Sequence, residues 1–170
     1  MRKSIGCYSR TAHLRLYLWR RWTERFEELW WIATSVRCAP RRGSVRAADT
    51  NILVRLIVQD EPSQVKAAER FVAGGVWVAT LVLAEMAWVL ARCYSMTASA
   101  QAAAIDLITN HEKVVVEDPA LITAAVERLR TAPMLSFSDC LILEGARRLG
   151  HLPLGTFDRR LAKQPGAVAP

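Results

Sequence analysis

The chain has 170 residues, of which 52% are hydrophobic, so it can bury a sizeable core and is not a disordered protein. Its net charge of +7 comes entirely from residues 1–44, because residues 45–170 hold 13 basic and 13 acidic side chains. No apolar run is long enough to span a membrane and no secretory signal is evident, so we expect a cytoplasmic protein.

Residues 1–44 differ in composition from the rest of the chain. They are basic and hold four of the six tryptophans. A basic, aromatic arm could bind nucleic acid or act as a partner-binding helix. The interpretation we favour is a translation start assigned too far upstream, with the true start near Val45. The reason is that residues 45–170 form a self-consistent domain, whereas the composition of the preceding segment does not match that of the domain.

From Val45 onward, short apolar stretches alternate with helical patterns. The stretches predicted as strands are 46–49, 76–80, 114–117 and 152–156. Strands separated by helical crossovers pair in parallel, with helices on both faces of the sheet. The sequence therefore predicts an α/β fold with one parallel central sheet.

Capping residues place the helices between these strands. Pro62 opens one helix, which Gly74 and Gly75 end, and Thr80 caps another that runs to about residue 94. Thr97 caps a helix to about residue 110, and Asp118 with Pro119 caps the next. The last long helix is expected to start at Ser138 and to stop at Gly150.

Four acids are predicted to meet at one edge of this sheet. Asp49 ends the first strand and Glu85 lies in the helix after the second. Asp139 opens the helix before the last strand, and Asp158 follows that strand. Ligands of open parallel sheets bind at the carboxyl ends of the strands. Carboxylate oxygens are the ligands of Mg²⁺ and Mn²⁺, and such a metal can activate water against a phosphodiester.

Each acid also has a purely structural interpretation. Asp49 can cap the helix that begins near Asn51, Asp139 can be a favourable first-turn charge, and Asp158 can start a turn. Glu85 is harder to explain in this way. It stands in "TLVLAEMAWVLA", where we expect it to be surrounded by apolar side chains and to need a polar partner. Trp77 and Trp88 are expected in the core.

The motifs "ADTNILVRLI", "VATLVLAEMAWVL", "LSFSDCLILEGARRLG" and "LPLGTFDRRLAK" together resemble a PIN-domain ribonuclease, most closely the VapC-like toxin of a VapBC toxin–antitoxin pair. The resemblance covers residues 45–163. It implies a PIN-like three-layer α/β/α sandwich over residues 45–170 and RNA cleavage with Mg²⁺ or Mn²⁺. A departure from the family pattern is Cys140, where alanine is common. Whether Glu144 joins the site is open.

The resemblance also assigns roles to individual residues. Asp49, Glu85, Asp139 and Asp158 would form the catalytic metal site, the first and third being the most direct ligands. The neighbours that would orient them are Thr50, Asn51, Ser138 and Thr156. Cationic side chains that could meet RNA phosphates are Arg147, Arg148, Arg159, Arg160 and Lys163, although an ordinary solvated helix face explains them equally well.

The same resemblance implies partners. A VapB-like antitoxin would put a charged side chain into the acidic pocket, and a homodimer would use helices such as 62–73 and 81–94. Three alternative functions remain open. A haloacid-dehalogenase-type phosphatase needs a second aspartate where Asn51 stands, which argues against it. The others are a catalytically silent PIN-fold binding protein and a DNase that uses the same pocket.

Overall fold

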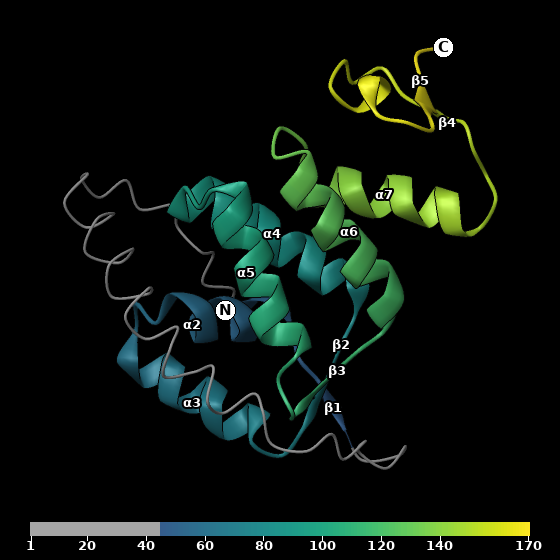
Figure 1. The fold of residues 1–170 in the computed structure, drawn as a ribbon. Helices are drawn as coiled ribbons and strands as arrows, with labels where there is room; N and C mark the ends of the chain where they lie inside the picture. Colours follow the sequence, from purple (N-terminus) through teal and green to yellow (C-terminus); the bar gives the residue numbers. More distant parts are fainter. Residues whose placement is uncertain (1–44) are drawn as a thin grey trace.

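The structure, a computed structural model, describes residues 45–170, so the interpretation of residues 1–44 lies outside it (Figure 1). The elements along the chain are β1 (Arg46–Ala47), α2 (Thr50–Val58), α3 (Pro62–Val72), β2 (Val76–Val78), α4 (Thr80–Tyr94), α5 (Ala98–Thr109), β3 (Val114–Val116), α6 (Pro119–Thr131), α7 (Phe137–Arg148), β4 (Leu154–Gly155), the 3₁₀ helix η2 (Leu161–Lys163) and β5 (Ala167–Val168).

The main sheet has three parallel strands in the order β1-β2-β3. Arg46 pairs with Val76, and Trp77 pairs with Val115. The first and last residues of β2 and β3 are buried valines, which face a core formed with the helices. The predicted fold class, an α/β sandwich around a parallel central sheet, is confirmed. Alternation along the strands turns Ala47, Trp77 and Val115 to the other face.

The prediction that residues 152–156 add a fourth strand to this sheet is wrong. β4 pairs in parallel with β5 in a separate two-stranded sheet. Residues 151–170 therefore form a C-terminal unit, which lies beyond α7 on the side away from the main sheet (Figure 1). The N–H of Leu154 donates to the Gly166 carbonyl at 2.8 Å, and the N–H of Thr156 donates to Val168 at 2.9 Å. These contacts replace those that the main sheet would have supplied.

The helix caps follow the sequence closely. The Thr97 side chain accepts from the N–H of Ala100, and that of Asp118 accepts from Leu121 at 2.9 Å. Two expectations were wrong by one residue. Ala79, not Thr80, is the N-cap of α4, and α7 begins at Phe137, after the N-cap Ser136, and not at Ser138.

Both tryptophans of the domain are on its surface, so their expected place in the core is wrong. Trp77 is 37% exposed because its neighbours Val76 and Val78 take the buried face of β2. Trp88 is 59% exposed on α4. Glu85 lies four residues after Leu81, and Trp88 lies three residues after Glu85, so the three side chains share one face of α4. Glu85 is therefore exposed as well, and is not surrounded by apolar side chains.

No helix among residues 45–170 is long and apolar enough to cross a membrane.

We predict that Asp118→Ala lowers the free energy of unfolding by about 1 kcal/mol at neutral pH, because the cap of α6 is lost. Donation from Leu121, and then from Arg148, holds the pKa of Asp118 below its usual value. The stabilisation is thus complete above pH ~4 and disappears as the pH falls through that lowered pKa. Urea unfolding at neutral and acid pH measures this difference.

The control is Thr123→Ala, an exposed change on the same helix, which should stay within about 0.5 kcal/mol of wild type. A loss in Asp118→Ala that stays equal at both pH values would contradict the capping argument.

Candidate active site

Asp49 connects β1 to α2. Its backbone is extended, and its Oδ1 accepts from the N–H of Ile52 at 3.1 Å, which makes it the N-cap of α2. The predicted neighbour Asn51 donates from Nδ2 to Oδ2 of Asp49 at 3.4 Å. Asp49 is exposed. Asp49 is therefore both a helix cap and a carboxylate at the carboxyl edge of the main sheet.

A hydrogen bond joins α2 to α4 directly beside Asp49. The Thr50 hydroxyl donates to Oε2 of Glu85 at 2.6 Å. Thr50 is only 6% exposed, so its hydroxyl has a fixed position. Since Thr50 follows Asp49 in the chain, this bond ties the Glu85 carboxylate to the residue next to Asp49.

Asp139 lies in the first turn of α7. Its Oδ2 accepts from the N–H of Ser136 at 3.0 Å and from the Ser136 hydroxyl at 2.6 Å, while its own N–H donates back to that hydroxyl. This is a capping box. Ser136, rather than the predicted Ser138, therefore orients Asp139. The neighbouring Cys140 is fully buried, and burial raises the pKa of its thiol to about 12, so the departure from alanine adds no reactive group.

Asp158 lies in the C-terminal unit and not at the edge of the main sheet. Its Oδ1 accepts from the N–H groups of Leu161 at 2.9 Å and Arg160 at 2.7 Å. These backbone donors lower the pKa of Asp158. The predicted neighbour Thr156 accepts from the N–H of Asp158 at 3.1 Å. These hydrogen bonds hold the turn around Asp158, and the pairing of β4 with β5 places it outside the main sheet that ends at Asp49.

Sequence reasoning missed one acid at the main edge. Glu117 directly follows β3, and its Oε2 accepts from the N–H of Thr80 at the start of α4 at 2.9 Å. The signal was available, because an acid at the end of a predicted strand is the pattern that singled out Asp49. The adjacent Asp118 also follows β3, but caps α6 and binds Arg148 at 2.8 Å.

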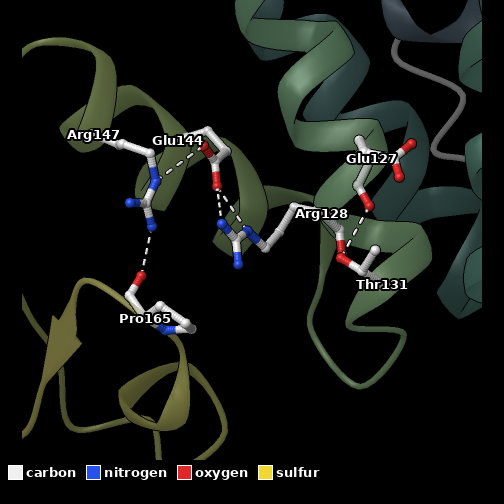
Figure 2. Close-up of polar contacts among 6 residues, drawn as sticks. All are labelled: Glu127, Arg128, Thr131, Glu144, Arg147 and Pro165. Carbon is white, nitrogen blue, oxygen red and sulfur yellow. Dashed lines mark hydrogen bonds and ion pairs between the residues drawn. The ribbon is translucent and has the colours of Figure 1, made fainter.

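Glu144 has a different role from the predicted acids. It is 6% exposed and lies between two arginines (Figure 2). Arg128 donates to its Oε1 from Nε at 2.7 Å, and Nε of Arg147 lies 3.3 Å from its Oε2. Nη2 of Arg147 also donates to the carbonyl of Pro165 at 2.5 Å, and so connects α7 to the C-terminal unit. Glu144 therefore forms a structural ion-pair network, in which Arg128 and Arg147 neutralise its carboxylate.

The arginines predicted to meet RNA differ in how far they are engaged. Arg147 and Arg148 form ion pairs with Glu144 and Asp118. The guanidinium of Arg160 donates to the carbonyl of Met134 at 3.4 Å. Arg159 is exposed and makes no hydrogen bond or ion pair within residues 45–170. Arg159 is therefore the arginine that remains available for a phosphate.

A family comparison identifies the domain. The family model described as PIN domain matches residues 47–167, most of the chain. The chain belongs to the PIN-domain family. No curated protein and no solved structure matches it. PIN domains are typically nucleases that use divalent metal ions, so the family supports a metal-dependent nuclease fold and nucleic-acid binding.

The chemistry of the acids in this PIN domain suits a hard cation, because carboxylate oxygens bind Mg²⁺ and Mn²⁺. Their placement in a single chain does not complete such a site. Within the part of the chain that the structure describes, no three histidine, cysteine, aspartate or glutamate side chains are grouped to hold a metal. The bond from Thr50 to Glu85 links the helices that carry Asp49 and Glu85, whereas Asp158 lies in the C-terminal unit.

We predict that Thr50→Val lowers the free energy of unfolding by about 1 kcal/mol, since it removes one hydrogen bond to a charged acceptor. Thr50→Ser keeps the hydroxyl and should keep most of the stability. Urea unfolding of both variants measures the difference. A loss in Thr50→Ser with none in Thr50→Val would show that packing of the Thr50 methyl group, and not the bond to Glu85, holds α2 against α4.

Glu144→Gln should cost more, about 2 kcal/mol, because it leaves the largely buried Arg128 without a counter-charge. Glu127→Gln is the matched control, because Glu127 is an exposed glutamate on α6 in a loose ion pair with Arg130. It should change the free energy of unfolding by less than about 0.5 kcal/mol. Similar losses in both variants would refute a special role for the buried network.

Proposed function

We propose that this PIN domain is an endoribonuclease that depends on Mg²⁺ or Mn²⁺. The observation that supports the proposal is the hydrogen bond between Thr50 and Glu85, which ties the Glu85 carboxylate to the residue that follows Asp49 after β1. Both acids are exposed, so a phosphodiester chain can reach them. This is the edge at which open parallel sheets bind their ligands.

The side chains of the site have separate tasks under this proposal. Asp49 and Glu85 supply the oxygen ligands, with Asp139 and Asp158 as the further acids. Thr50 fixes the orientation of Glu85, Ser136 fixes that of Asp139, and Arg159 is available to neutralise a phosphate. A divalent metal, when bound, would supply a Lewis acid for phosphodiester hydrolysis.

The toxin assignment rests on the motif contexts around the four acids. We propose that the protein is the VapC-like toxin of a VapBC pair, with an antitoxin whose cationic side chain enters the acidic edge. Exposed carboxylates at Asp49 and Glu85 fit a positively charged partner group. We propose a homodimer as the toxin's own assembly.

A catalytically silent PIN protein is the second candidate. The observation in its favour is that Asp49, Asp139 and Asp158 all accept hydrogen bonds from nearby backbone N–H groups, so each has a structural role without any metal. Such a protein would bind a partner or nucleic acid without cleaving it.

Cleavage of total RNA by the full chain separates these candidates. We predict metal-dependent cleavage that EDTA abolishes and that Asp49→Asn lowers by roughly 100-fold or more. Asp106→Asn is the matched control, because Asp106 lies on α5 and pairs with Arg130 of α6. This variant should cleave RNA as wild type does. A folded wild-type protein that cleaves no RNA with either metal would favour the silent candidate, and cleavage of a single-stranded DNA of equal sequence would favour a DNase.

A further inference from the structure

The exposed face of α4 carries a mixed set of side chains. Leu81 is 75% exposed and Trp88 is 59% exposed, and Glu85 and Arg92 are exposed as well. With 3.6 residues per turn, these four positions lie within an arc of about 60° along the helix. Tryptophan has a large apolar surface to bury, so an indole left in solvent beside a second exposed apolar side chain indicates a binding surface.

This face runs away from the carboxyl edge of the main sheet. α4 begins at that edge, where the N–H of Thr80 donates to the glutamate that follows β3. Glu85 comes next and accepts from the Thr50 hydroxyl at 2.6 Å. At a rise of about 1.5 Å per residue, Trp88 lies about 5 Å and Arg92 about 10 Å beyond Glu85 along the helix axis. A polymer that is bound at the edge and extends along α4 therefore meets Trp88 first and Arg92 next.

Arg92 is available to a ligand. It makes no hydrogen bond or ion pair within residues 45–170, whereas other arginines of the domain, such as Arg128 and Arg148, are paired with acids. An exposed guanidinium without an acid to neutralise can bind a phosphate through its fixed set of donors.

The composition of this face favours a nucleic acid over a protein as its ligand. The buried centres of protein interfaces are depleted of charged residues. On α4 the carboxylate of Glu85 separates the two apolar side chains, and a guanidinium follows the indole. Grooves that bind single-stranded nucleic acid combine positive charge along the backbone with aromatic rings that stack on bases. Trp88 and Arg92 supply one group of each kind, four residues apart on the same helix.

We propose that Trp88 and Arg92 form a nucleotide-binding subsite, in which the indole stacks on an unpaired base of RNA and the guanidinium binds an adjoining phosphate. Bases inside a duplex are stacked on their neighbours, so the subsite accepts only bases that are free to leave such a stack. This inference rests on the proposed function and names the residues that hold the RNA beyond the acids. The subsite contributes to binding and not to the chemical step.

The subsite is testable in EDTA, where RNA binding is measured without cleavage. The full chain is titrated against a fluorescein-labelled single-stranded RNA of mixed sequence, and fluorescence anisotropy gives the dissociation constant. Trp88→Ala should weaken binding about tenfold, because one stacked base is lost. Trp88→Tyr keeps an aromatic ring and should restore most of the affinity. Leu81→Ala is the matched control and should bind as wild type does, because it removes an exposed apolar side chain of the same face that cannot stack on a base.

Two further measurements separate the base from the phosphate. With an RNA of equal length that lacks its bases, the affinity lost by removing the bases should be about tenfold smaller in Trp88→Ala than in wild type. Arg92→Gln should reduce the slope of log affinity against log salt concentration by about 0.7, the value for one phosphate of a single strand. Arg70→Gln on α3 is the matched control for charge, because Arg70 is also exposed, and should leave that slope higher than Arg92→Gln does.

Several results would overturn the subsite. Wild-type affinity in Trp88→Ala, an equal loss in Leu81→Ala, or a loss that does not depend on the bases would each show that the indole does not stack on RNA. An unchanged salt slope in Arg92→Gln would reject its phosphate contact. If Trp88→Ala elutes from a sizing column as a smaller species than wild type, the face is an interface between copies of the chain, and the proposal is wrong.

Failure of the subsite and failure of the proposed function give different results. Metal-dependent RNA cleavage by wild type, together with unchanged RNA binding in Trp88→Ala, would keep the nuclease and reject the subsite. Binding that depends on both the bases and Trp88, from a wild-type protein that cleaves no RNA with either metal, would keep the subsite and reject the nuclease.

Discussion

The hydrogen-bonding needs of very short strands control the layout of this protein. β1 and β4 each have two residues, so neither can be a stable element without neighbours that accept its backbone groups. β1 is hydrogen-bonded to β2 on one side, and β4 is hydrogen-bonded to β5. Since Asp49 and Asp158 follow these two strands, the choice of strand partner decides which acids share an edge. The position of Asp158 relative to Asp49 therefore depends on sheet pairing.

Features that depend on local chemistry could be predicted from the sequence. Thr97 and Asp118 cap the expected helices, because a cap needs only its own side chain and the next turn. The placement of residues 152–156 could not be predicted. A two-residue strand satisfies its backbone in either sheet, and the alternation of apolar residues is the same in both. The predicted burial of Glu85 and Trp88 failed for a similar reason: α4 is apolar on most sides, so its pattern does not show which face meets solvent.

Capping and metal binding are compatible uses of the same carboxylates. Asp139 accepts both Ser136 donors at Oδ2, and within residues 45–170 its Oδ1 accepts no hydrogen bond. Asp158 accepts two backbone donors at Oδ1, which leaves Oδ2 equally open in that part of the chain. A cap therefore fixes the orientation of the group and keeps one oxygen for a ligand. For Asp139 and Asp158, the structural interpretation and the catalytic one thus concern different oxygens of the same carboxylate.

The buried Glu144 network gives the C-terminal unit its direction. Glu144 holds Arg147 at Nε, which leaves Nη2 of the same guanidinium to bind the Pro165 carbonyl. A planar guanidinium fixes the angle between its two partners, so the contact orients the unit and does more than attach it. With Leu161 packed inward, Phe157 and the turn that holds Asp158 remain on the outside. An ion pair that lies outside the acidic edge therefore orients the C-terminal unit, and with it the turn that holds Asp158, on α7.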